Sequence, residues 1–210
     1  AGYGESAYAA DIYATGQCGA EGSDVSWELS AQTMALSISG TGAMADYASN
    51  SSVPWTSVRD KITSATIAAG VTSVGYNAFY NCSSMATVSI PATVTAIGNY
   101  AFYGCSNLTN VTIPDGVTTI ASSAFQNCAA LTAITLPATV TTIGGNAFRG
   151  CSKLESITLP AGLTSIGGYA FYACAALTAI TIPDGVTTIS DNAFSGCSNL
   201  TAINLPAGLT

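Results

Sequence analysis

Most of the chain follows a pattern of apolar and polar positions that repeats every twenty-three residues. In the copy at residues 131–152 (LTAITLPATVTTIGGNAFRGCS), Leu131, Ile134 and Leu136 have the spacing of a short strand that points alternate side chains into a core. Pro137 ends this strand, because proline lacks the N–H that a longer ladder would need. A repeat of this length predicts a solenoid, in which each coil buries its apolar face against its neighbours.

Each copy continues with a second extended segment and a turn. Asp115-Gly116 has turn chemistry, and Val117 and Ile120 then alternate with polar residues as a second short strand does. Phe and Cys follow at a spacing of three, which favours one helical or 3-10 turn that carries both side chains inward. The cysteines of this structural column are Cys82, Cys105, Cys128, Cys151, Cys174 and Cys197.

The pattern divides the chain into three parts. Residues 65–210 are the predicted solenoid, a mainly β fold of about six coils with short helical or 3-10 turns and no C-terminal cap. Residues 18–64 are a predicted N-terminal cap, since Trp27 and Leu29 alternate with polar residues as hairpin strands do. Residues 1–17 lack strong periodicity and form an arm, which is either a tail or a segment that docks on another molecule. Its candidate contact residues are Tyr3, Tyr8 and Tyr13.

Composition and charge narrow the function classes. Apolar residues make up 49% of the chain and mean hydropathy is +0.43, yet every apolar stretch is far shorter than the roughly 20 residues of a spanning helix, so we expect no membrane insertion. The net charge is −7, and two pairs of cations cannot form a phosphate-binding stripe, so we expect no nucleic-acid partner. The first residue is Ala1 rather than Met, which is consistent with a secreted protein whose signal peptide has been removed.

The residue types argue against an enzyme. The chain contains no histidine, which excludes a Ser-His or Cys-His nucleophile pair, and its acidic residues are too scattered for a glycosidase pair. We expect no catalytic residue, no cofactor and no metal site. The cysteines are expected to be buried, reduced thiols. The alternative is that some of them pair or bind metal, because equivalent positions in stacked coils lie about 4.8 Å apart.

The repeat resembles the BspA-like leucine-rich repeat of bacterial and protist surface proteins. The resemblance rests on the motif I/L-P-x-x-V/L-T-x-I-x-x-x-A-F-x-x-C-x-x-L, which six copies keep in register, and on cap segments such as Val25–Leu29 (VSWEL) and Pro54-Trp55. It implies a β-rich cap before the repeats, and adhesion or surface display at the cell surface, without catalysis. The exposed positions here are mostly Thr, Ala, Ser or Gly rather than charged residues.

Several surface residues are candidates for contact or modification. Four tyrosines occupy turn positions of the first two coils where the third has serine or glutamine; they either bind a partner or pack over the coil edge. These residues are Tyr76, Tyr80, Tyr100 and Tyr103. Trp27 and Trp55 are expected to fill the cap, with ligand stacking as the alternative. The predicted glycosylation acceptors are Asn50, Asn107, Asn110 and Asn199.

Three functions remain open. The first is a non-enzymatic extracellular structural or surface-display protein that self-associates head to tail, with its arm or cap against an open C-terminal edge that includes Leu205 and Leu209. The second is a cell-surface adhesin that binds a protein or glycan ligand of a host or neighbouring cell. The third is an ice-binding protein, suggested by outward rows of threonine such as Thr118, Thr141 and Thr164.

Overall fold

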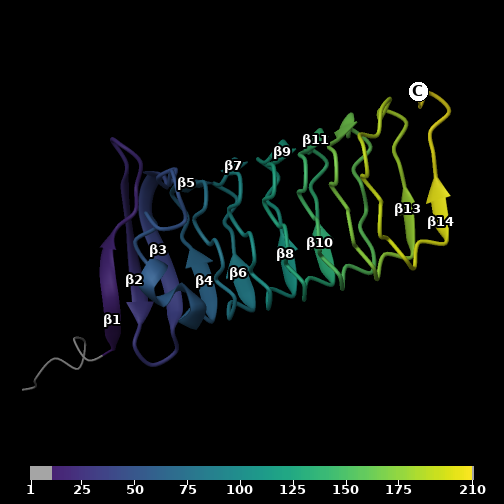
Figure 1. Ribbon diagram of the computed structural model, residues 1–210. Coiled ribbons are helices and arrows are strands. Elements are labelled where there is room, and N and C mark those ends of the chain that lie inside the picture. The colour runs from purple at the N-terminus through teal and green to yellow at the C-terminus, as the bar shows by residue number, and fades with distance from the viewer. Residues whose placement is uncertain (1–10, 210) are drawn as a thin grey trace, which may run out of the picture.

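The chain forms an elongated stack of coils that runs from β1 at one end to β14 at the other (Figure 1). The structure is a computed structural model, and it describes residues 11–209. It confirms the predicted solenoid of about six coils. The helical content of the described residues is a single 3-10 helix, η1 (Thr56–Lys61), which lies between the cap strands and the first coil.

The cap is an antiparallel sheet that changes into the parallel ladders of the solenoid. Strand β2 (Asp24–Ser30) pairs antiparallel with β1 (Ile12–Gln17) on one side and with β3 (Ala35–Ala43) on the other. The two halves of β3 then pair in parallel with different strands, its first half with β4 (Ser64–Ile67) and its last residues with β5 (Val71–Val74). One long strand therefore starts both ladders of the solenoid.

Strand β1 lies within residues 1–17, which the sequence pattern predicts to be an arm separate from the cap. In the structure, residues 12–17 belong to the cap sheet, and the Thr15 hydroxyl donates to the Trp27 carbonyl at 2.8 Å. The difference arises because an edge strand is held by backbone hydrogen bonds, which need no apolar periodicity. Tyr13 is 48% exposed on this strand, whereas Tyr3 and Tyr8 lie outside the described residues.

Each coil after the cap contributes short strands to two ladders. The first row of segments, which we call the strand edge, contains the strands β4, β6 (Thr87–Ser89), β8 (Asn110–Thr112), β10 (Ala133–Thr135), β13 (Ala179–Thr181) and β14 (Ala202–Asn204). The segment 156–159 occupies the equivalent place in the coil between β10 and β13 but is not a strand. The second row contains β5, β7 (Ala96–Ile97), β9 (Thr119–Ile120), β11 (Thr142–Ile143) and β12 (Ser165–Ile166). Their registers match the repeat, with Ile134 beside Val111 and Ile143 beside Ile120 and Ile166.

The Phe–Cys segments, which we call the turn edge (residues 75–82 and the equivalent segments of the later coils), contain no continuous helix. The Cys128 N–H donates to the Phe125 carbonyl three residues back at 3.2 Å, as in a 3-10 turn, but the Phe125 N–H donates to Ala147 of the next coil at 2.9 Å. Local and inter-coil hydrogen bonds alternate along the segment, because two residues in each coil have a positive φ that turns the backbone toward the next coil. These residues are Asn77, Tyr100, Ser123, Asn146, Tyr169 and Asn192, and Asn81, Gly104, Asn127, Gly150, Ala173 and Gly196.

The core behind the turn edge is a stack of aromatic rings. Adjacent phenylalanine rings from Phe79 to Phe194 lie nearly parallel, with centroids 5.1 to 5.7 Å apart. Trp55 extends this stack into the cap, 6.0 Å from Phe79, and its indole N–H donates to the Ala78 carbonyl at 2.9 Å. Trp27 packs edge-on against Trp55 at 5.6 Å, and both tryptophans are buried, so they fill the cap and do not stack on a ligand.

Candidate functional site

The cysteine column lies in the core, where its chemistry is suppressed. All seven cysteines are buried and free, and the Cys128 thiol donates to the Phe102 carbonyl of the preceding coil at 3.2 Å. Burial raises the pKa of the Cys82 and Cys128 thiols to about 12. Because the thiolate is the nucleophile and the metal ligand, these cysteines act as small apolar side chains at neutral pH.

The described residues offer no assembled metal centre. Between residues 11 and 209, no group of three or more His, Cys, Asp or Glu side chains is arranged to hold an ion. Within the same residues, no helix has the length and apolar character that spanning a bilayer requires.

Three of the four candidate tyrosines come together on the turn edge. The rings of Tyr80 and Tyr103 are stacked, with centroids 4.5 Å apart and planes within 5° of parallel. Tyr100 lies 6.0 Å from Tyr103, and the Arg59 guanidinium lies 6.0 Å from the Tyr80 ring. Burial, followed by the neighbouring Tyr103, raises the pKa of Tyr80. This cluster presents aromatic faces and a cation, the side chains that dominate the energetics of many interfaces.

A second cluster of the same kind occurs three coils later. Arg149 lies 5.0 Å from the ring of Tyr172 and 5.8 Å from that of Tyr169, and the two rings are 5.7 Å apart. Sequence reasoning missed both tyrosines, although they follow Tyr100 and Tyr103 by three full repeats, which is the signal that reveals them. We call the two clusters together the Tyr–Arg row, which consists of Arg59, Tyr80, Tyr100, Tyr103, Arg149, Tyr169 and Tyr172.

The fourth candidate, Tyr76, takes no part in this stacking. It is 45% exposed and lines a groove of about 550 Å³ beside β5, β7, β9 and β11. The groove is also lined by Asp46 from the cap and by Asn99 and Ser122 from later coils. The structure therefore separates Tyr76 from the tyrosines with which the sequence groups it.

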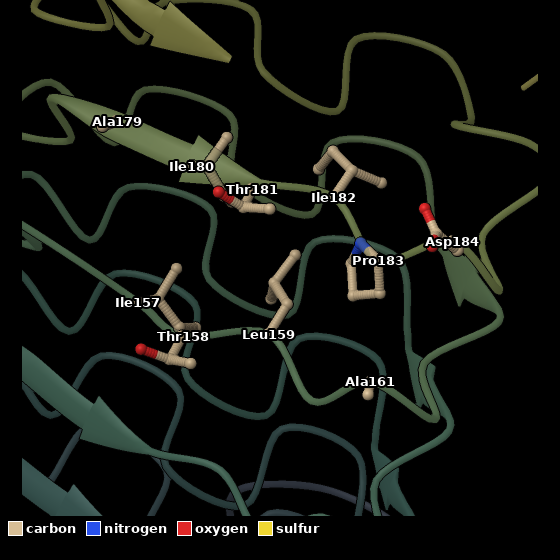
Figure 2. A pocket seen from close by; sticks show the side chains of 10 residues that line it. All are labelled: Ile157, Thr158, Leu159, Ala161, Ala179, Ile180, Thr181, Ile182, Pro183 and Asp184. Atoms are coloured by element: carbon tan, nitrogen blue, oxygen red, sulfur yellow. The ribbon is translucent and has the colours of Figure 1, made fainter. Parts of the chain in front are cut away.

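A further cavity, of about 620 Å³, interrupts the strand edge. Figure 2 shows its lining, in which Ile157 and Leu159 of one coil face β13 and the residues that follow it. The backbone of residues 156–159 makes no hydrogen bond to any residue that the structure describes, whereas β10 and β13 on either side each pair with a neighbouring strand. The lining is mostly aliphatic, with Asp184 as its one ionisable side chain.

The outward threonines are partly engaged with the protein itself. The hydroxyl of Thr141 donates to the Thr118 carbonyl at 3.3 Å, and that of Thr164 donates to the Thr141 carbonyl at 3.1 Å. The Thr95 and Thr201 hydroxyls make the same bond to the preceding coil. These hydroxyls contribute to coil stacking, and their protons are not free for a partner.

The remaining candidates lie on separate parts of the surface. Asn107, Asn110 and Asn199 are exposed, while Asn50 is half-buried beside Arg59. In the last described coil, Leu205 is 54% exposed and Leu209 packs partly against the core.

Comparison with known proteins matches the chain to leucine-rich repeat proteins. A family model described as BspA type leucine rich repeat region, in six copies, matches residues 58–174 and 118–210. The structure is similar to a leucine-rich repeat protein of T. pallidum, with a TM-score of 0.68 and 28% identity over 91% of this chain and 84% of that one. It is also similar to one from Bacteroides ovatus, with a TM-score of 0.63 and 27% identity over 89% of this chain; the match spans about half (53%) of that protein. No curated protein matches the chain.

Proposed function

The chain belongs to the BspA-type leucine-rich repeat family, and we propose that it is a non-enzymatic recognition scaffold that binds its partner through the Tyr–Arg row. Proteins with these repeats are typically displayed at the surface or secreted, and we place this chain there as part of the proposal. Of the functions considered from the sequence, this is the adhesin.

The observation that carries the proposal is the backbone conformation of two tyrosines. Tyr100 and Tyr169 both have φ of 58°, a left-handed conformation that costs a residue with a Cβ of the order of 1 kcal/mol. Asparagine, which tolerates this conformation, occupies the equivalent position in three other coils, as Asn77, Asn146 and Asn192. Tyrosine is a poor choice for the fold at these two positions, and both side chains are about 40% exposed (42% and 39%). A role in recognition accounts for their presence.

The arrangement of the row adds to this argument. Each cluster holds a cation beside two or three aromatic rings, and the clusters contain two of the four basic residues of a chain whose net charge is −7. Tyrosine and arginine provide large contact area with little loss of conformational entropy, so they are frequent at the centres of interfaces.

The test replaces both strained tyrosines by the residue that suits the backbone. In Tyr100→Asn/Tyr169→Asn, we expect the melting temperature to stay the same or rise, because backbone strain is relieved, while binding of the labelled protein to intact bacterial and epithelial cells falls at least about tenfold. Tyr13→Ser, which removes an exposed tyrosine from the cap, is the matched control and should bind as the unaltered chain does. A lower melting temperature with unchanged binding would show that the tyrosines are packing residues.

The other functions and modifications stay predictions. Head-to-tail self-association is measured by sedimentation velocity over a range of concentrations, and ice binding by thermal hysteresis. Glycosylation at Asn50, Asn107, Asn110 or Asn199 is measured by the intact mass of native material.

A further inference from the structure

The groove beside Tyr76 is a second surface with the features of a binding site. It crosses four coils along β5, β7, β9 and β11, and its volume is about 550 Å³. Part of its lining is formed by Ala96, Gly98 and Gly144, whose side chains are small or absent. Polar side chains and one aromatic ring lie among them. Concave sites lined by apolar surface with a few convergent polar groups are the usual form of a ligand site.

Tyr76 is held in place by the backbone around it. A Cβ on Gly98 would lie 2.3 Å from Tyr76 Cδ1, so the tyrosine ring rests directly on the glycine. The Tyr76 N–H donates to Asp46 Oδ1 at 2.9 Å, which ties this coil to the cap. The ring is nevertheless 45% exposed. A positioned and exposed aromatic face is able to stack on an apolar face of a ligand without first being ordered.

The polar groups of the groove are only partly used by the protein. Asp46 Oδ2 has no hydrogen bond to any described residue. Asn99 Oδ1 accepts from the Ser122 N–H at 3.1 Å, while the Asn99 amide NH₂ donates to no described residue. Thr119 and Thr142, each of which carries a hydroxyl, also line the groove. The site therefore offers a carboxylate acceptor, an amide donor and hydroxyls that do both.

The charged side chains of the groove indicate which class of ligand could use these polar groups. No lysine or arginine lines the groove, and its one ionisable acid is Asp46, so it is unsuited to sulfated, phosphorylated or other polyanionic ligands. A neutral sugar combines a C–H face that stacks on an aromatic ring with hydroxyls that donate to a carboxylate and accept from an amide. We propose that the Tyr76 groove binds a neutral glycan chain laid across the coils. This inference rests on the recognition scaffold proposed above and gives that scaffold a second, chemically different ligand.

The experiment titrates the full chain with soluble neutral oligosaccharides of glucose, mannose and N-acetylglucosamine, and with heparin as the polyanion, by isothermal calorimetry. We expect saturable binding of at least one neutral oligosaccharide and none of heparin. Tyr76→Ser should weaken this binding at least about tenfold, and Tyr76→Phe, which keeps the ring, should retain it. Asp46→Asn, which keeps an oxygen for the Tyr76 N–H but removes the charge, should also weaken it.

Tyr13→Ser provides the matched control, because it removes a tyrosine of similar exposure (48%) that does not line the groove. Circular dichroism melting of each variant separates loss of the site from loss of the fold. If no neutral oligosaccharide binds at millimolar concentration, if heparin binds in preference, or if Tyr76→Ser and Asp46→Asn both bind unchanged, the inference is wrong. Cell binding that still depends on Tyr100 and Tyr169 would then leave the proposed function standing.

Discussion

The turn edge and the strand edge belong to the same coils, but only the turn edge is uninterrupted. At each of the five junctions between Phe79 and Phe194, the turn edge repeats one ring stack, one Phe N–H bond to the next coil and one Cys thiol bond to a Phe carbonyl. The strand edge is divided into separate ladders, and residues 156–159 belong to none of them.

The difference follows from what each edge uses to hold its coils. The turn edge combines backbone hydrogen bonds with buried Phe and Cys columns that each hold one residue type, so every junction makes the same core contacts and the register is strongly determined. The strand edge places varied aliphatic side chains in its columns, and its exposed positions carry small polar residues. We infer that the turn edge holds the register of the solenoid, while the strand edge tolerates variation and a local opening.

The largest expected difference between the edges is in amide hydrogen exchange. We expect the amides of residues 156–159 to exchange with an opening free energy near zero, whereas Phe148, bonded to Ala170 at 2.8 Å, should require global unfolding, a difference of at least about 5 kcal/mol. Residue-resolved exchange by NMR measures this, and Ile134 in the paired strand β10 is the control. Equal protection at Ile157 and Ile134 would show that the strand edge is continuous in solution.

A core substitution sharpens the comparison. Phe125→Ala removes a ring stacked between Phe102 and Phe148, at 5.2 and 5.7 Å, and should lower the free energy of unfolding by about 3–5 kcal/mol. Thr135→Ala, on the exposed side of β10, should lower it by less than about 1 kcal/mol. Urea unfolding measures both, and similar losses would contradict a dominant role for the turn edge.

Alkaline pH should act on the turn edge through its buried thiols. The pKa of Cys128 is raised from 9.0 to about 12 by burial, so between these values the unfolded chain loses the thiol proton while the folded chain keeps it. The contribution of this thiol to the free energy of unfolding is therefore fully present below pH 9. It falls as the pH rises above 9, by about 1.4 kcal/mol per pH unit for each such thiol. Urea unfolding from about pH 8 to about pH 10 measures the slope. Cys128→Ala should make it shallower by one thiol, and an unchanged slope would contradict this account.

The sequence predicts the features that depend on repetition. The Phe and Cys columns, the two ladders and the tryptophan-filled cap follow from residue spacing, because identical residues recur at each register position. The opening at residues 156–159 does not, since Ser-Ile-Thr-Leu alternates there as well as Ala-Ile-Thr-Leu does at residues 133–136. The Tyr76 groove could not be foreseen either, because it joins a cap carboxylate to side chains from as far along the chain as the fourth coil.

The left-handed positions of the turn edge also escape sequence analysis, because five residue types occupy them. Ala173 is one of these residues, with φ of 58°, and glycine stands at the equivalent position in three other coils, as Gly104, Gly150 and Gly196. Since a Cβ disfavours this conformation, Ala173→Gly should raise the free energy of unfolding by about 0.5–1 kcal/mol, against the usual effect of glycine. Ala129→Gly, at the residue that follows the turn edge of an earlier coil and has no positive φ, should lower it by a similar amount. Urea unfolding of both variants decides the matter, since a loss of stability in both would mean that backbone strain plays no part at the turn edge.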